Sequence, residues 1–216
     1  MKWSEQAWLS AKPIYDKILE LPFILELMNG TLSEDKFIFY IRQDALYLAE
    51  YGKILTGIAS RLNKPEHIEA FVGFAGESIR VENALHASFV HALKKEKNEP
   101  SPSCLLYTSY LHKQISNARV EVALAAVLPC FRIYKEVGDY ILKNQAKEGN
   151  RYQSWIDTYG GEEFENSVST AIAICDEIAS KCTEEQQQAM TEAYITCSRF
   201  EWMFWESAYR LEPWKI

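Results

Sequence analysis

A long helix is predicted by residues 33–62, which read SEDKFIFYIRQDALYLAEYGKILTGIASRL. Ser33 is suited to cap this helix, because a serine side chain accepts hydrogen bonds from the free amides of a first turn. Gly30 precedes it, and we expect this glycine to end a short helix over the segment PFILELMN. Pro65 follows it and opens the next helix, where its missing N–H costs nothing.

Helical signals continue along the rest of the chain. We expect helices over residues 65 to about 95, 102–116, 118 to about 147, a short segment around Trp155, 162–181, and from a Thr183–Gln186 capping box to near Pro213. Breaks fall at the polar segment 98–103, at Gly149, and at Tyr159-Gly160-Gly161. No segment alternates apolar and polar residues as a half-buried strand would. The sequence therefore predicts an all-α fold, a multi-helix bundle with a single domain over residues 1–216.

The composition excludes several classes of protein. The 216 residues include 23 basic and 30 acidic side chains, a net charge of −7, with 48% hydrophobic residues. That balance is globular, and it argues against nucleic acid or an anionic membrane surface as a partner. No run reaches the ~18 apolar residues of a membrane span, and the first residues, MKWSEQAW, lack the apolar core of a signal peptide. Five cysteines without a CxxC pair complete the expectation of a cytoplasmic protein with reduced thiols.

One candidate site lies within the opening stretch. Asp44, Tyr47 and Tyr51 are spaced i, i+3 and i+7, so they share one face of the predicted helix. An aspartate on an aromatic face can receive and orient a protonated or amino-bearing ring. The alternative is an aspartate at the edge of the core that is hydrogen-bonded to a tyrosine hydroxyl.

A second candidate is the segment Leu128-Pro129-Cys130-Phe131-Arg132-Ile133-Tyr134. A proline inside a helix removes one backbone hydrogen bond and bends the axis. Cys130 follows that proline, and Tyr134 is one turn further on. A thiolate is the reactive form of cysteine, so Cys130 would need a partner that takes its proton. The alternative is a bent core helix in which the cysteine only fills space.

A third candidate is Glu201, which four aromatic residues surround within positions 200–205. A carboxyl in apolar surroundings has a raised pKa, because desolvation disfavours its charged form. Such a group can donate and recover a proton near neutral pH. Glu206 does not share a face with Glu201, and spacing alone leaves open which of them points inward.

A metal site is discounted. Glu82 and His86 are spaced i, i+4, with His91 further round the helix, and could pair or bind a metal. Ferritin-like di-iron bundles, however, need a Glu-x-x-His pattern twice, and none of the four histidines has a glutamate three residues before it. No residue points specifically to haem.

The chain resembles a known family almost from end to end. The matching fragments are Pro22-Phe23, Asn29-Gly30-Thr31-Leu32, Gln43-Asp44, Glu82 with Leu85-His86, Ser101-Pro102, Tyr107-Thr108-Ser109, Leu128-Pro129-Cys130, Tyr159-Gly160-Gly161, and Glu201 with Phe204-Trp205. Each fragment alone is weak, but in this order and spacing they resemble the TenA or thiaminase II family. Cys130 places the chain with the cysteine-bearing branch.

The resemblance implies a haem-oxygenase-like helical fold without haem. It also implies an enzyme of thiamin pyrimidine salvage, which hydrolyses 4-amino-5-aminomethyl-2-methylpyrimidine to the hydroxymethyl pyrimidine and ammonia, and which also cleaves thiamin. It implies no metal and no organic cofactor. The family usually forms a homotetramer, so we expect one here.

The resemblance also implies roles for individual residues. Cys130 is the nucleophile, Glu201 is the general acid and base, and Asp44 binds the pyrimidine and helps to activate the thiol. The residues that line the pocket are Tyr47, Tyr107, Tyr134, Tyr159 and Phe204. Arg132 stands where the family often has an aromatic residue, and at two residues past Cys130 it should point away from the thiol. Two other classes remain: a non-catalytic carrier of an aromatic amine, and a regulatory helical bundle.

Overall fold

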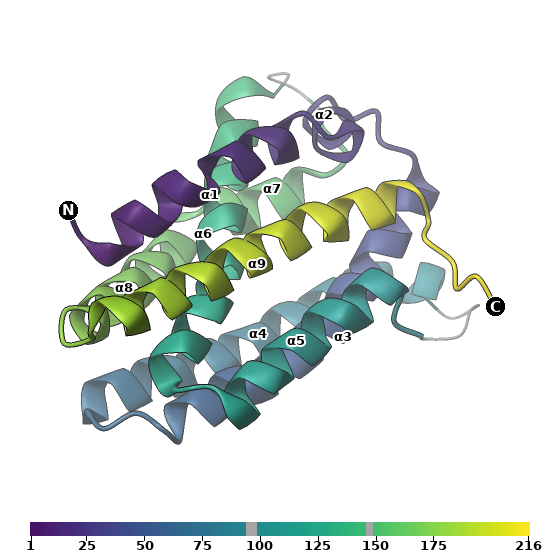
Figure 1. The fold of residues 1–216 in the computed structure, drawn as a ribbon. Coiled ribbons are helices and arrows are strands. Elements are labelled where there is room, and N and C mark those ends of the chain that lie inside the picture. Colours follow the sequence, from purple (N-terminus) through teal and green to yellow (C-terminus); the bar gives the residue numbers. More distant parts are fainter. Residues whose placement is uncertain (94–98, 146–148) are drawn as a thin grey trace. The chain divides into compact units, whose positions relative to one another are not determined.

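The computed structural model describes residues 1–93, 99–145 and 149–216, with the side chains of residues 81–93 left undescribed. Over these residues the secondary structure is helical, without strands, which confirms the all-α prediction (Figure 1). The helices are α1 (Trp3–Leu19), α2 (Pro22–Met28), α3 (Glu34–Ala59), α4 (Pro65–Leu93), α5 (Pro102–Asn117), α6 (Val120–Asn144), α7 (Gln153–Gly160), α8 (Glu162–Ala179) and α9 (Glu184–Tyr209).

Most predicted boundaries lie within a few residues of the observed ones. The capping box is confirmed: Thr183 N donates to Gln186 Oε1 at 2.8 Å, and Gln186 N donates to Thr183 Oγ1 at 3.3 Å. Gly30 follows α2 with a φ of +69°, the left-handed conformation that favours glycine. The predicted capping bond of Ser33 is wrong. Ser33 occupies the N-cap position, but its side chain makes no capping hydrogen bond, and Glu34 and Asp35 supply the favourable negative charge of the first turn instead.

Helix α1 was not among the helices predicted from the sequence. Its buried side chains recur every three or four residues, which is the spacing of one helix face. The buried apolar members are Trp3, Ala7, Ala11, Tyr15 and Ile18.

The chain divides into two compact units, and the prediction of one domain stays a prediction. Unit 1 comprises residues Met1–Leu32 and Glu121–Trp205. Within it α1 packs on α2 and α8, and α7 packs on α8. Asp176 of α8 caps α1, because its carboxylate accepts hydrogen bonds from both Ser4 N and Ser4 Oγ at 2.8 Å.

Unit 2 comprises residues Ser33–Val120 and Glu206–Ile216. Its centre is α3, which packs against both α4 and α5; the three helices lie side by side in Figure 1. Arg61, just after α3, donates hydrogen bonds to the carbonyl oxygens of Ile115 at 2.8 Å and Ala118 at 2.6 Å. These bonds tie the end of α3 to the end of α5.

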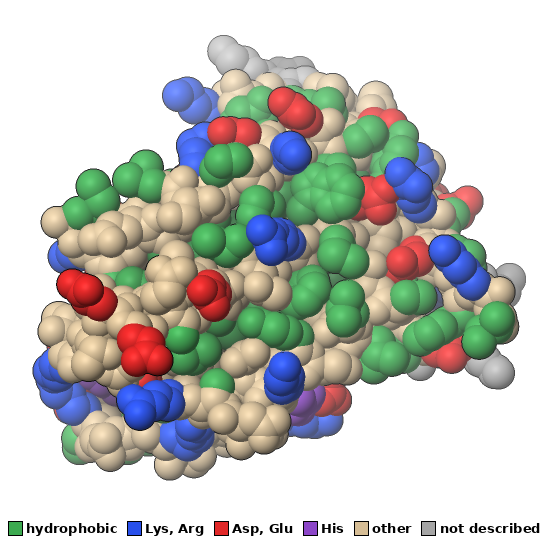
Figure 2. Space-filling view, viewed as in Figure 1, with side chains coloured by type: hydrophobic (Ala, Val, Ile, Leu, Met, Phe, Trp, Pro, Cys, Tyr) green, Lys and Arg blue, Asp and Glu red, His purple; other side chains and the backbone are tan. Residues whose placement is uncertain are grey.

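The surface agrees with the composition. Acidic and basic side chains are interspersed over the face shown in Figure 2, with apolar side chains between them. In the part of the chain that the structure describes, no helix is both long enough and apolar enough to cross a membrane.

Candidate functional site

Asp44 is a buried acidic side chain of unit 2. It lies on α3 with 1% of its surface exposed, and its Oδ2 atom has no hydrogen-bond partner among the described residues. Burial raises the pKa of this carboxyl from 3.8 to about 7. A buried polar atom without a partner costs free energy, so such a group needs an explanation beyond packing. Asp44 is therefore not at the edge of the core, and its carboxyl is suited to exchange a proton with a ligand near neutral pH.

The neighbouring Gln43 joins α3 to the segment that precedes α5. Its buried side-chain amide donates to the carbonyl oxygen of Glu99 at 3.2 Å and accepts from Ser101 N at 2.7 Å. Ser101 in turn caps α5, since Cys104 N donates to its Oγ at 3.3 Å. The side chain of Gln43 thus fixes the segment before α5 against α3. The pair Gln43-Asp44 is one of the fragments that carry the family resemblance, but this structural role of Gln43 was not predicted.

A group of contacting aromatic rings follows Asp44 along α3. The rings of Tyr47 and Tyr51 are stacked with centroids 5.3 Å apart, and Tyr107 of α5 lies 5.0 Å from Tyr47. All three rings are buried. The predicted aromatic face is therefore present, and α5 contributes Tyr107 to it.

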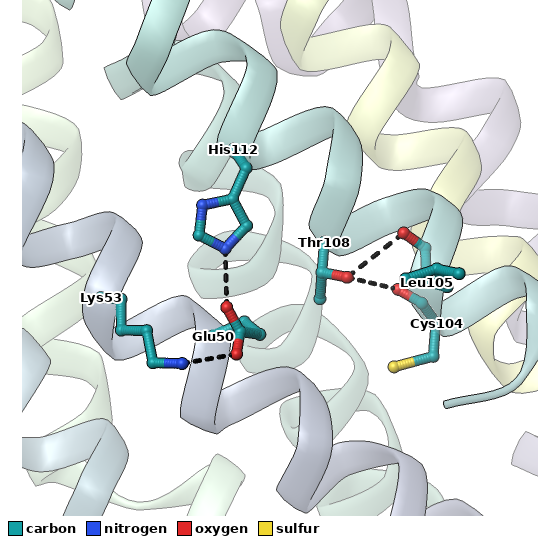
Figure 3. Close-up of polar contacts among 6 residues, drawn as sticks. All are labelled: Glu50, Lys53, Cys104, Leu105, Thr108 and His112. Carbon is teal, nitrogen blue, oxygen red and sulfur yellow. Dashed lines mark hydrogen bonds and ion pairs between the residues drawn. The ribbon is translucent and has the colours of Figure 1, made fainter. Parts of the chain in front are cut away.

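A polar contact between Glu50 and His112 also joins α3 and α5, the two helices that carry these rings (Figure 3). Glu50 of α3 lies 2.7 Å from His112 Nε2 of α5 and accepts from Lys53 Nζ at 2.6 Å. The hydrogen bond from Lys53, followed by that of His112, lowers the pKa of Glu50. On α5, the hydroxyl of Thr108 donates to the carbonyl oxygen of Cys104 at 3.0 Å, so it points along its own helix (Figure 3).

Cys130 lies on α6 in unit 1, directly after Pro129, which is inside the helix as predicted. It is half-buried, whereas Cys104, Cys175 and Cys197 are buried. Burial raises the pKa of each of those three thiols, so they stay protonated and unreactive. Exposure therefore favours Cys130 over the three buried cysteines as a nucleophile.

Tyr134, one turn after Cys130, is the centre of an aromatic cluster. Its ring centroid lies 4.9 Å from that of Tyr159 on α7 and 4.8 Å from that of Trp205 on α9. The three rings thus come from three helices of unit 1. Tyr134 and Tyr159 were both predicted to line the site, and the structure brings them into contact.

Gly138 lets α7 approach α6 closely at this cluster. A Cβ atom on Gly138 would lie only 2.7 Å from the carbonyl carbon of Tyr159 and 2.9 Å from Gly160 N. No larger residue fits without moving that backbone. Gly138 therefore places Tyr159, and this role was not predicted because it depends on a contact between distant segments.

Glu201 and Glu206 differ as the helix spacing predicted. Glu201 is 1% exposed, whereas Glu206 forms an ion pair with Arg210, and its side chain is 23% exposed. Glu201 and Cys130 both contribute to the raised pKa of Cys197, after burial. Cys197 is one turn before Glu201 on α9, so this carboxyl and the Cys130 thiol lie on the same side of unit 1. Phe204 is buried on the same helix.

Each unit thus gathers part of the predicted site. Asp44, Tyr47 and Tyr107 are together in unit 2, and Cys130, Tyr134, Tyr159, Glu201 and Phe204 belong to unit 1. Their roles, and their meeting around one substrate, stay predictions.

The remaining candidates concern a metal and Arg132. The side chains of Glu82, His86 and His91 lie outside the described residues. Among the side chains that are described, no group of three His, Cys, Asp or Glu residues is arranged to hold a metal ion. Arg132 donates from Nη1 to the carbonyl oxygen of Ser4 at 3.1 Å and stacks over the ring of Trp8 at 4.5 Å, so its guanidinium is engaged by α1.

Comparison with known sequences gives full-length relatives. The sequence profile of the TENA/THI-4/PQQC family matches residues 8–211. An aminopyrimidine aminohydrolase of Bacillus subtilis is 33% identical over 220 residues, which cover 99% of this chain and 92% of that protein. A Helicobacter pylori protein of the same name is 28% identical, covering 97% of this chain and 100% of that one.

Solved structures agree with the sequence comparison. A TenA homologue from P. horikoshii OT3 has a TM-score of 0.84 at 27% identity, covering 97% of this chain and 99% of that one. A domain with a haem-oxygenase-like fold from Shewanella denitrificans has a TM-score of 0.75 at 12% identity and covers 96% of this chain and 92% of that one; this likeness concerns the fold alone. Because the profile and the relatives span nearly the whole chain, this protein belongs to the TENA/THI-4/PQQC family.

Proposed function

We propose that this protein is an aminopyrimidine aminohydrolase of thiamin pyrimidine salvage. It converts 4-amino-5-aminomethyl-2-methylpyrimidine and water to the hydroxymethyl pyrimidine and ammonia, and it also cleaves thiamin. The observation that carries the proposal is Asp44, a buried carboxyl with one unpartnered oxygen and a pKa of about 7. An aminopyrimidine supplies what that carboxyl lacks, because its ring nitrogen and adjacent amino group form a paired acceptor and donor. The full-length relatives that bear this activity in their names support the same assignment.

The chemistry requires the three residue types to act together. Direct displacement of an amine from a methylene on an aromatic ring is difficult. The Asp44 carboxylate takes the proton of the Cys130 thiol. When the thiolate adds to an electron-poor ring carbon, the ring nitrogen takes that proton from Asp44 and aromaticity is lost. The ring electrons can then expel the amine, which Glu201 protonates as the carbon–nitrogen bond breaks.

The second half of the reaction reverses the first. Glu201, now a carboxylate, takes a proton from water while the water oxygen bonds to the methylene carbon. The carbon–sulfur bond breaks, the ring returns its proton to Asp44, and the thiolate is regenerated. Burial keeps the Glu201 carboxyl away from bulk water, as suits a group that must pass its proton to the leaving amine.

The aromatic residues supply binding rather than chemistry. Stacked and tilted rings offer large contact area at a small entropic cost, and a flat heterocycle is their natural ligand. The ring of Tyr47, between Tyr51 and Tyr107, and the ring of Tyr134, against Tyr159, are the two aromatic groups proposed to hold it. Phe204 is proposed to complete the pocket. The enzyme is proposed to act as a cytoplasmic homotetramer without metal or organic cofactor.

The proposal is tested by incubating the protein with the aminopyrimidine and, separately, with thiamin. Ammonia is measured by a coupled dehydrogenase assay, and the pyrimidine products by chromatography. We expect Cys130→Ser and Glu201→Gln to abolish turnover. The matched controls are Cys182→Ser, at another half-buried cysteine, and Glu206→Gln, which loses only a surface ion pair; both should retain most of the activity.

Two results would contradict the proposal. A wild-type protein that binds the aminopyrimidine without releasing ammonia is a carrier or a regulator, and the enzyme assignment is then wrong. Activity that survives Glu201→Gln but is lost in Glu206→Gln would exchange the roles of the two glutamates.

A further inference from the structure

Trp205 carries a buried indole N–H group that has no role in the proposed mechanism. Its side chain has 0% exposure, and its indole N–H has no hydrogen-bond partner among the described residues. Two other tryptophans show what an indole N–H normally does in this fold. Trp3 Nε1 donates to Thr191 Oγ1 at 3.1 Å, and Trp214 Nε1 donates to the carbonyl oxygen of Pro100 at 3.0 Å.

The position of Trp205 connects it to the reacting groups of unit 1. It is four residues after Glu201 on α9, so the two side chains are neighbours on one face of that helix. Its ring lies 4.8 Å from that of Tyr134, with the ring planes inclined by 38°. Tyr134 is itself four residues after Cys130 on α6. Trp205 therefore lies where the helix face that carries Glu201 meets the helix face that carries Cys130.

The chemistry of the indole restricts what it can hold. The indole N–H donates one hydrogen bond and accepts none, so its partner must offer a lone pair. A buried donor that is left unpaired costs free energy, and a buried water is the usual way in which such a donor is satisfied. A water at this place would lie beside the carboxyl of Glu201, which is the group that must take a proton from water in the second half of the proposed reaction.

We propose that the indole N–H of Trp205 holds the water that Glu201 activates. This inference rests on the proposed function and adds a positioning residue to it. The water accepts from Trp205, donates one hydrogen to the Glu201 carboxylate and keeps a lone pair for the methylene carbon. When that lone pair forms the carbon–oxygen bond, the donated proton passes to Glu201, the ring regains its electrons and returns its proton to Asp44, and Cys130 leaves as thiolate.

The first test removes only the N–H. Replacing Trp205 by benzothienylalanine keeps the bicyclic ring and its contact with Tyr134 but puts sulfur in place of the N–H. Because ammonia leaves before water attacks, we expect a burst of one ammonia per active site, followed by turnover about tenfold or more slower than in the wild type. Steady release of ammonia at the wild-type rate would overturn the inference.

The control is Tyr194→Phe. The hydroxyl of Tyr194 is also buried without a partner among the described residues, but it lies two helical turns from Glu201 rather than one. This variant should show neither the burst nor the slower turnover. A burst of equal size in Tyr194→Phe would mean that loss of any buried polar atom of α9 has this effect, and the inference would be wrong.

The second test needs no substitution in the protein studied. The protein is labelled with ¹⁵N-tryptophan, the Trp205 indole signal is assigned with Trp205→Phe, and the hydroxymethyl pyrimidine product is added. The product's hydroxyl oxygen takes the place of the water, so the Trp205 indole proton should shift, while the Trp3 indole, which is bonded to Thr191, should not. An unchanged Trp205 signal with bound product overturns the inference alone. A wild type that neither binds the product nor releases ammonia overturns the proposed function, and this inference with it.

Discussion

Replacing Asp44 by asparagine is expected to make the protein more stable and inactive. The carboxyl is buried, and no hydrogen bond among the described residues reaches its Oδ2 atom. In the unfolded chain its pKa is 3.8, and burial raises it to about 7 in the folded protein. Between these two values the unfolded chain is ionised while the folded protein keeps its proton, so stability falls as the pH rises through this window.

The size of the effect follows from the difference in pKa. Each unit corresponds to about 1.36 kcal/mol, so a difference of about three units gives a penalty of at most about 4 kcal/mol above pH 7. At pH 4.5 only about 1 kcal/mol of that penalty has developed. Asparagine has nearly the same shape and no charge, so Asp44→Asn should remove the pH-dependent part at both values.

The measurement is urea unfolding of the wild type and of Asp44→Asn at pH 8 and pH 4.5, followed by circular dichroism. The gain in the free energy of unfolding should be several kcal/mol larger at pH 8 than at pH 4.5. The control is Asp35→Asn, an exposed aspartate in the first turn of the same helix, which should lower stability by no more than about 1 kcal/mol at either pH. An Asp44→Asn protein that gains nothing at pH 8, or that keeps its hydrolase activity, would refute the reasoning.

Two further predictions concern residues that place the site. Gly138→Ala forces a methyl group against the backbone of Tyr159, so we expect a loss of several kcal/mol in unfolding free energy and a raised KM. The control is Gly73→Ala, at a helical site where a Cβ would meet nothing within 4 Å, which should stabilise the protein by about 0.5–1 kcal/mol. Equal effects of the two substitutions would contradict the close approach of α7 to Gly138. Gln43→Ala leaves the buried Ser101 N–H without its acceptor, so we expect the free energy of unfolding to fall by about 1–3 kcal/mol and amide hydrogen exchange to become faster over the start of α5. Unchanged exchange there would contradict the anchoring role of Gln43.

Much of the fold was predictable because its signals are local. Capping residues, prolines and glycines lie next to the helix ends that they set, as at Gly30, Pro65 and Thr183. The failure at Ser33 is also local: the position was right, but the acidic first turn of α3 does not use the serine hydroxyl.

The site was predictable only in part. The spacing of Asp44, Tyr47 and Tyr51 defines a helix face, and the structure buries all three. Gln43 and Gly138 act through contacts with segments 20 or more residues away, which neither spacing nor composition can indicate. The roles of the reacting residues came from the family resemblance, since no spacing rule joins residues on separate helices.

The most direct test of the central claim is a crystal structure of the protein with the hydroxymethyl pyrimidine product bound. The account predicts one pyrimidine whose ring nitrogen and amino group are hydrogen-bonded to Asp44, whose ring carbon lies against the sulfur of Cys130, and whose hydroxyl lies beside Glu201. A pyrimidine that is bound by Asp44 but is out of reach of the sulfur and of the Glu201 carboxyl would contradict it.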